Sequence, residues 1–191
     1  MEFEIIKMDS YRAIYPRNVV LVTTIDNEGK PNIITLAWTM NVSFRPAIVA
    51  ISIANTNRYS YKLLQQVEEY VVNVPTKEII KEVLFCGRNS GKDVNKFQAT
   101  SLTPLPANKV QPPIIKECIG FIECQVINKV KAGDHTVFFG KVLDCYIKKE
   151  YSLEKKGYDL NKTQLIYHLG RNEFTINSSE RIHIDEWWKK F

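Results

Sequence analysis

The chain has 191 residues, its composition is 45% hydrophobic and 25% charged, and its formal net charge is +5. These values fit one globular domain with a sizeable core and exclude a disordered chain. The longest apolar runs are far shorter than the ~20 residues of a membrane helix, so we expect no membrane partner. A mildly basic protein attracts anionic cofactors as readily as nucleic acid. Since no nucleic-acid motif is recognisable, we expect no nucleic-acid partner.

The first ten residues carry acidic side chains and no apolar signal core, which predicts a cytoplasmic protein. Cysteines stay unpaired in that reducing compartment, so we expect buried free thiols rather than disulfides. The cysteines show no C-x-x-C spacing and the histidines are scattered, so we expect no metal site. The residues concerned are Cys86, Cys118, Cys124, Cys145, His135, His168 and His183.

Three strands are predicted in the first third of the chain. Residues 19–25 form a β-branched run, and a loop at 26–31 containing Gly29 joins this run to a strand over 32–38, which is the pattern of a hairpin. A polar loop follows, and a third strand is predicted over 47–53.

A polar cluster follows the third strand. Thr56, Arg58 and Ser60 offer hydroxyls and a guanidinium. Ser60 is predicted to cap a helix that begins near Tyr61. The N–H groups of a helix N-terminus beside an arginine suit a phosphate dianion. An ordinary strand-to-helix turn with a solvated Arg58 explains the same residues, and spacing alone favours that interpretation.

The remaining elements alternate short helices with strands. We predict helices over 61–66, 77–86 and 93–99, strands over 70–74, 117–130, 135–148 and 165–169, a proline-rich loop over 103–113 and a tight turn at 132–134. Many short strands with few helices indicate a closed antiparallel barrel with helical insertions.

Seven blocks of the sequence, weak singly, are informative together. They are 35–40 (TLAWTM), 42–53 (VSFRPAIVAISI), 58–62 (RYSYK), 70–75 (YVVNVP), 86–97 (CGRNSGKDVNKF), 133–135 (GDH) and 139–140 (FG). In this order, over roughly 10–146, they resemble the flavin reductase-like, FMN-binding split-barrel family, particularly its flavoredoxin-type branch. The resemblance implies a mainly β fold with helical insertions, the Greek-key antiparallel split β-barrel, as a single domain over 1–191. It also implies a homodimer. The C-terminal strand and tail at 147–191 would then lie against the second subunit or another partner, and an unpacked tail is the alternative interpretation.

FMN needs cations and hydrogen-bond donors for its phosphate and a flat apolar slot for its isoalloxazine ring. The resemblance implies cofactor contacts from two loops, with Arg58 and Ser60 at the phosphate: Thr56, Arg58, Ser60, Cys86, Ser90, Lys92, Asp93 and Lys96. Without the resemblance, each lysine would be interpreted as a solvated surface charge. Cys86 is interpreted as a packed residue near the cofactor, because a redox thiol needs a lowered pKa that no sequence feature indicates.

The flavin ring would lie against two strand ends, where an irregular backbone can present N–H and C=O groups to a planar ring. The residues implied are Thr35, Leu36, Ala37, Trp38, Thr39, Asn41, Ser52 and Ile53. A tryptophan such as Trp38 is more often a core residue, and its place in the 35–40 block is what favours the flavin pocket.

His135 is the candidate catalytic residue, because the resemblance places it near the nicotinamide of an electron donor. The eight glycines lack the G-x-G-x-x-G and P-loop spacings, so NAD(P)H would stack transiently on the bound flavin rather than occupy a Rossmann site. A histidine in a hairpin turn is the alternative interpretation of His135.

The sequence therefore predicts a flavin-dependent oxidoreductase of the NAD(P)H:flavin reductase type. The alternative is a flavoredoxin-like FMN electron carrier that accepts electrons from a protein partner, and lysines at 148–156 and 189–190 suit an acidic partner. A non-redox ligand-binding barrel is a third hypothesis, which the intact 58–60 and 86–93 blocks disfavour.

Overall fold

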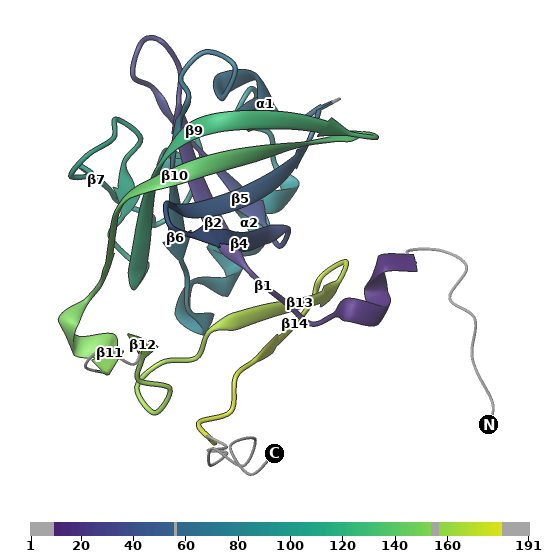
Figure 1. The fold of residues 1–191 in the computed structure, drawn as a ribbon. Coiled ribbons are helices and arrows are strands. Elements are labelled where there is room, and N and C mark those ends of the chain that lie inside the picture. The colour runs from purple at the N-terminus through teal and green to yellow at the C-terminus, as the bar shows by residue number, and fades with distance from the viewer. Residues whose placement is uncertain (1–9, 56, 154–156, 181–191) are drawn as a thin grey trace.

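The computed structural model describes residues 10–55, 57–153 and 157–180. Strands dominate this part of the chain, and its helices are short (Figure 1). The helices are η1 (Ser10–Ile14), α1 (Tyr59–Leu63), η2 (Lys77–Ile79), α2 (Ile80–Arg88), α3 (Lys96–Ala99) and η3 (Lys149–Tyr151). The strands are β1 (Arg17–Asn18), β2 (Val20–Ile25), β3 (Pro31–Leu36), β4 (Thr39–Phe44), β5 (Ala47–Ala54), β6 (Glu69–Val74), β7 (Pro104–Leu105), β8 (Ile114–Ile115), β9 (Gly120–Ala132), β10 (His135–Ile147), β11 (Ser152–Leu153), β12 (Gly157–Tyr158), β13 (Ile166–Gly170) and β14 (Glu173–Ile176). None of the helices in these ranges is long and apolar enough to cross a membrane.

Seven strands form the main sheet in the order β3-β2-β6-β9-β10-β5-β4, and all neighbouring strands are antiparallel. The sheet encloses a core, but within the described chain its edge strands β3 and β4 do not hydrogen-bond to each other. The mainly β split barrel is thus confirmed, whereas the expectation of a closed barrel is wrong. Ala37 and Trp38 alone connect the two edge strands, so the chain crosses the split at these residues.

Strand β2 contributes side chains to two hydrophobic cores, because both of its faces are buried. Side chains alternate across a strand, so Val20 and Val22 point to one face and Leu21 points to the other. The two valines belong to the core inside the barrel, together with Tyr70 and Phe138. Leu21 belongs to a second core outside the barrel wall. Burial of a side chain of this size contributes roughly 1.5–3 kcal/mol, so β2 stabilises both layers.

Helices α2 and α3 cover the outer core beside β3. Val83 and Cys86 of α2 and Phe97 of α3 are buried there with Ile33 of β3. The Thr35 hydroxyl on β3 donates to the Val83 carbonyl over 2.6 Å, which holds α2 against the end of that strand. The C-terminal end of α2 and the loop that follows it therefore lie beside the split.

The longest strands, β9 and β10, form a hairpin whose tight turn confirms the one expected at 132–134. Gly133 in this turn has a φ of +60°, a conformation that favours glycine. His135 begins β10 and pairs with Ala54 at the end of β5. The hairpin therefore carries His135 to the strand end that precedes the polar cluster.

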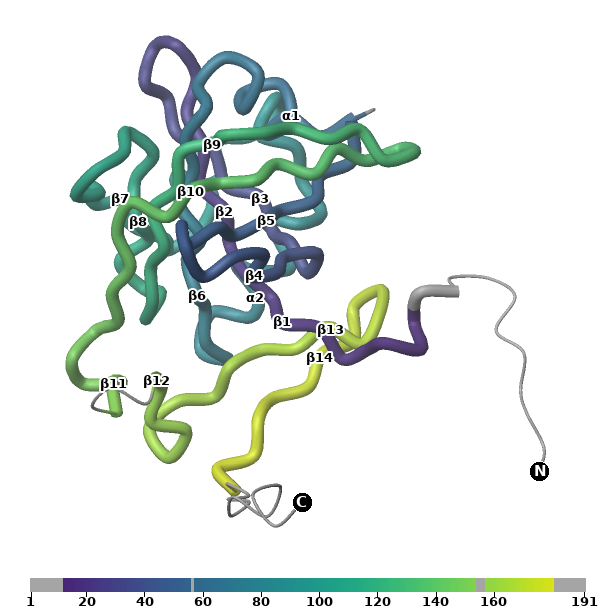
Figure 2. The backbone as a smooth tube through the Cα atoms, viewed as in Figure 1, coloured from purple at the N-terminus to yellow at the C-terminus, as the bar shows by residue number. Residues whose placement is uncertain are grey.

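The last two strands form a small sheet with β1, in the order β1-β13-β14. Figure 2 shows these three strands together, below the barrel. Arg17 pairs with His168, so the N-terminal segment and the C-terminal hairpin lie side by side. The strand predicted at 165–169 is confirmed with a shift of one residue. The aromatic tail at 187–191 lies outside the described residues.

Two further expectations are wrong in detail. The polar loop expected before the third strand is strand β4, because its backbone pairs with β5 although most of its side chains are exposed. Cys145 is exposed, whereas the other three cysteines are buried as predicted, and none of the four forms a disulfide. No cluster of histidine, cysteine or acidic side chains in the described part of the chain could hold a metal ion.

Candidate functional site

Three cavities open beside the split, and Arg58 lines all of them. Arg58 immediately precedes α1, and its Nη1 donates to the Gly87 carbonyl over 3.4 Å. Gly87 lies in the last turn of α2. The guanidinium therefore joins the start of α1 to the end of α2, and Arg58 contributes its positive charge to each cavity.

The first cavity has a volume of about 180 Å³ and is rich in hydrogen-bonding side chains. It is lined by Asn32, Ile34, Asn57, Arg58, Tyr59, Ser60, Cys86, Arg88, Asn89, Ser90, Gly91 and Lys96. Three of these residues are cations and none is acidic. Such a cavity suits an anion that accepts several hydrogen bonds, as a phosphate does.

Lys96 is a buried cation at the first cavity. Its side chain is 5% exposed, and Nζ donates to the carbonyls of Ile33 over 2.6 Å and Cys86 over 2.7 Å. Burial lowers the pKa of Lys96 to about 8, and the positive charge of Arg58 adds to this shift. Burial also raises the pKa of the Cys86 thiol to about 11, so this thiol is uncharged at neutral pH. No carboxylate of the described chain pairs with Lys96, and an anion in the cavity would be its first ionic partner.

Ser60 has a different role from the one predicted. Helix α1 begins at Tyr59, earlier than expected, and no side chain caps it. Ser60 is buried, and its Oγ accepts a hydrogen bond from Nδ2 of Asn32 over 2.7 Å. A side chain at Gly91 would collide with Asn32, so glycine lets the loop after α2 approach this pair. The predicted cap is wrong because the Ser60 hydroxyl joins α1 to β3 instead.

The second cavity has a volume of about 300 Å³ and forms a slot at the split. It is lined by Tyr15, Ile34, Thr35, Leu36, Ala37, Trp38, Ser52, Ile53, Ala54, Arg58, His135 and His168. The Ser52 N–H donates to the Trp38 carbonyl over 2.9 Å, which joins the β3–β4 linker to β5. No acidic residue lines the slot, and its apolar side chains and strand-end backbone suit a flat ring.

Trp38 and His135 stack at this slot, with ring centroids 4.6 Å apart and ring planes inclined by 29°. The His135 Nδ1 lies 2.8 Å from Oδ1 of Asp134, and this hydrogen bond lowers the pKa of the exposed Asp134 carboxyl. The Nε2 atom of His135 has no hydrogen-bond partner among the residues that the structure describes. It is therefore the ring nitrogen available to a ligand.

The structure brings most of the predicted contact residues together. The slot contains Thr35, Leu36, Ala37, Trp38, Ser52, Ile53 and His135; the first cavity contains Ser60, Cys86, Ser90 and Lys96; Arg58 lines both. Thr39 lines a neighbouring cavity that shares Trp38 and Ser52 with the slot. Asn41 on β4 is exposed, as are Lys92 and Asp93 in the turn after Ser90, and these three line neither cavity. Thr56 lies outside the described residues.

Sequence reasoning missed several lining residues because they come from distant segments. Tyr15 and His168 reach the slot through the pairing of β1 with β13, which no local pattern reveals. Arg88 was more accessible to prediction, since it lies inside the 86–97 block and ends α2. If the helix predicted over 77–86 had been extended by two residues, Arg88 would have been placed at its C-terminal end, next to Gly87.

A model of the flavin reductase like domain matches residues 11–173. The chain belongs to this family. An uncharacterized protein of Archaeoglobus fulgidus is 35% identical, over 95% of this chain and 98% of the relative. A Pseudomonas putida protein named flavin reductase is 28% identical, over 74% of this chain and 81% of the relative.

Solved structures share the fold of this flavin reductase-like chain. The flavoredoxin of Desulfovibrio vulgaris (Miyazaki F) matches with a TM-score of 0.86 at 23% identity, covering 97% of this chain and 98% of that one. An FMN-binding protein of Thermus thermophilus matches with a TM-score of 0.82 at 19% identity, covering 96% of this chain and 99% of that one. At these identities the likeness shows the split-barrel fold, and the family membership rests on the match over residues 11–173.

Arg58→Ala should weaken the binding of FMN far more than that of riboflavin, which lacks the phosphate. A charge-assisted hydrogen bond contributes about 1.5–3 kcal/mol, so the dissociation constant of FMN should rise roughly ten- to a hundredfold. Titrations of flavin fluorescence measure both ligands, with Lys81→Ala on the exposed side of α2 as the control. Equal weakening of the two flavins would mean that Arg58 supports the fold rather than the phosphate.

The affinity for FMN should fall as the pH rises through about 8, the value to which burial lowers the pKa of Lys96. Above that pH the free protein must take up a proton to present a charged Lys96 to the phosphate. The dissociation constant should therefore rise by up to about tenfold per pH unit. Isothermal titration in two buffers of different ionisation enthalpy measures the proton uptake. The affinity for riboflavin should not change with pH in this range, and neither should the affinity of Lys96→Met for FMN. A constant affinity of the wild type for FMN from pH 7 to 9 would exclude a contact between Lys96 and the phosphate.

Proposed function

We propose that this protein binds one FMN per chain at the split and acts as an NAD(P)H-dependent flavin reductase. The observation that carries the proposal is that the cationic cavity and the flat slot adjoin each other, since both are lined by Ile34 and Arg58. A flavin mononucleotide likewise has an anionic end and a planar apolar end. The match of residues 11–173 to the flavin reductase like domain supports the same cofactor class.

In this proposal the phosphate occupies the first cavity. Arg58 and Lys96 provide the charge, and Ser90 provides a hydroxyl. The phosphate would offset part of the cost of burying Lys96, which has only carbonyl partners in the described chain. Lys92 and Asp93 remain proposed contacts at the edge of the site, where the exposed lysine adds positive potential.

The isoalloxazine ring occupies the slot in this proposal. The end of β3 and its linker supply backbone groups on one side, and Ser52 and Ile53 of β5 supply the other. The stacked pair of Trp38 and His135 provides aromatic surface at the slot. When bound, FMN supplies the chemistry of hydride acceptance, while the protein binds, orients and shields the ring.

A nicotinamide nucleotide is the first candidate for the electron donor. His135 lines the slot and keeps Nε2 available, so it is the residue proposed to position the donor. The absence of Rossmann glycine spacing in the sequence favours transient binding of the donor at the flavin. The Pseudomonas putida relative named flavin reductase supports this candidate.

A flavoredoxin-like electron carrier is the second candidate. The fold of the Desulfovibrio vulgaris flavoredoxin supports it, and so do Lys148 and Lys149, which suit an acidic redox partner. The carrier would use the same flavin site without a nicotinamide contact at His135.

We also propose a homodimer in a reducing cytoplasm. Strand β4 is an edge of the main sheet and exposes Met40, Val42 and Phe44, the last with 97% of its surface accessible. An apolar row on an unpaired strand edge is a surface that tends to associate. The four free thiols support a reducing compartment. Sedimentation velocity would distinguish the dimer from a monomer.

Purified protein should take up about one FMN per chain, and anaerobic NADH or NADPH should bleach the visible absorption of the bound flavin. Equilibrium dialysis measures the stoichiometry, and stopped-flow absorption measures the reduction. Flavin binding without bleaching would contradict the reductase hypothesis and favour the electron carrier. A protein that takes up no FMN would contradict both.

His135→Phe should slow reduction of the bound flavin by the nicotinamide donor about tenfold or more, because a positioning hydrogen bond is lost. Phenylalanine keeps a ring to stack on Trp38, so the affinity for FMN should change far less than the rate. Asp134→Asn is the matched control, since it removes the charge beside Nδ1 and keeps the imidazole. Unchanged reduction in His135→Phe would make the histidine a hairpin residue only.

A further inference from the structure

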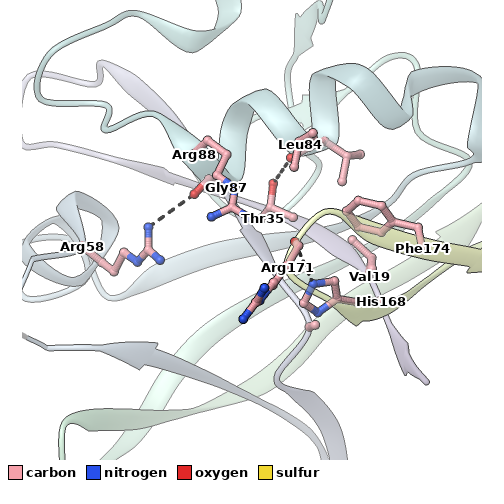
Figure 3. A pocket seen from close by; sticks show the side chains of 11 residues that line it. Val19, Thr35, Arg58, Leu84, Gly87, Arg88, His168, Arg171 and Phe174 are labelled. Atoms are coloured by element: carbon pink, nitrogen blue, oxygen red, sulfur yellow. Dashed lines mark hydrogen bonds between the residues drawn. The ribbon is translucent and has the colours of Figure 1, made fainter. Parts of the chain in front are cut away.

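The third cavity has a volume of about 260 Å³ and lies between α2 and the C-terminal hairpin (Figure 3). It is lined by Val19, Thr35, Ala37, Arg58, Val83, Leu84, Gly87, Arg88, His168, Arg171 and Phe174. Figure 3 shows the apolar side chains of Val19, Leu84 and Phe174 on one side and the three arginines on the other. A molecule bound here would meet both an apolar surface and positive charge.

The cavity adjoins the flavin slot. Four lining residues are common to the two: Thr35, Ala37, Arg58 and His168. Arg88 and Arg171 are not needed for the flavin ring, because neither lines the slot. Arg171 lines neither the slot nor the first cavity, so its charge serves the third cavity alone.

The positive charge in this cavity is uncompensated. No acidic side chain lines it, and in the described chain none of its three arginines belongs to an ion pair. Arg88 donates to the Asn172 side chain and Arg58 donates to the Gly87 carbonyl, both of which are neutral acceptors. Arg171 has no side-chain hydrogen bond among the described residues. Guanidinium groups gathered without a carboxylate favour an anion between them.

The backbone holds Arg171 at the cavity in an unusual conformation. Arg171 occupies the turn between β13 and β14 with a φ of +51°, where glycine or asparagine is favoured. Two contacts fix the turn: Arg88 bonds to Asn172, and Nε2 of His168 lies 3.3 Å from the Arg171 carbonyl. The hairpin thus presents a guanidinium at a position where a smaller residue would fit the backbone better.

We propose that this arginine pocket, formed by Arg88, His168, Arg171 and Phe174, binds a small organic anion beside the flavin. The ligand class is a molecule with one ring or a short apolar body and a carboxylate or phosphate group. The volume of about 260 Å³ lies just below the ~300–1,000 Å³ of common small-molecule pockets, so it suits one ring and not a whole dinucleotide. Anion binding follows from the pocket itself, and only the position of the anion beside a flavin rests on the proposed function.

The test uses the full chain, with and without FMN, and three probes of similar shape: benzoate, phenyl phosphate and uncharged benzamide. Isothermal titration or ligand-observed NMR at millimolar probe should detect benzoate or phenyl phosphate, and the stronger of the two identifies the acid group. Binding should weaken as salt is added, because the contact is between charges. Benzamide should bind at least tenfold more weakly than the better anion. Equal binding of benzamide, or no binding of either anion, would overturn the proposal.

Two variants assign the binding to this pocket. Arg171→Asn suits the turn conformation and should weaken the bound anion roughly ten- to a hundredfold, while Arg171→Lys should retain part of the affinity. Leu84→Trp should block the cavity without removing charge. Lys81→Gln, on the same helix as Leu84 and exposed, should leave binding unchanged. Anion binding that survives Arg171→Asn would overturn the assignment, as would an unchanged affinity in a folded Leu84→Trp.

Competition separates this proposal from the flavin proposal. Protein saturated with FMN should bind the anion about as well as free protein, and Arg171→Asn should bind FMN as wild type does. Displacement of the anion by FMN would mean that the pocket belongs to the flavin site, which would overturn the second site. If wild type binds no FMN but binds the anion through Arg171, the proposed function fails and the anion pocket stands.

Discussion

Hydrogen bonding in the main sheet stops between β3 and β4, and the candidate site depends on that interruption. Ala37 and Trp38 carry the chain from one edge strand to the other. In a closed barrel the backbone groups at these strand ends would be used in the ladder, and none would face a ligand. The split leaves them at a slot instead, while the bond from Ser52 to the Trp38 carbonyl keeps the linker in place. Segments that are far apart in the chain then meet at the split, including the tip of the β9–β10 hairpin, which carries His135, and the end of α2.

The charge distribution around the split is local and does not follow from composition. The chain holds 21 acidic residues against 26 lysines and arginines, yet no acidic side chain lines any of the three cavities. Burial of Lys96 without a carboxylate costs free energy that two carbonyl hydrogen bonds only partly offset. Because Lys96 is already buried and ordered in the folded protein, the site is preorganised. An anionic ligand can therefore interact with Lys96 without further ordering of that side chain.

The sequence predicts elements where side-chain pattern determines structure and fails where tertiary contacts do. The strands around Val20 and Val72 follow from β-branched runs, and the turn at Gly133 follows from its glycine. Strand β4 was missed because its pairing with β5 leaves apolar and polar side chains alike in solvent. The capping propensity of Ser60 was correct as a local preference, but Asn32 offers the hydroxyl a buried partner. Arg171 reaches the site through pairing of chain segments that are distant in sequence, which no local pattern encodes.

If the slot binds FMN as proposed, its surroundings favour a small electron donor over a protein. A protein partner would have to reach the flavin between strand β4 on one side and the β13–β14 hairpin near Tyr15 and His168 on the other. A homodimer formed through β4 would narrow that approach further, because the exposed side chain of Phe44 would then be covered by a second chain. A nicotinamide ring needs only contact with the flavin face and a few positioning groups. The arginine pocket beside the slot has a volume of about 260 Å³ against about 300 Å³ for the slot, so it suits a small anion rather than a second large cofactor.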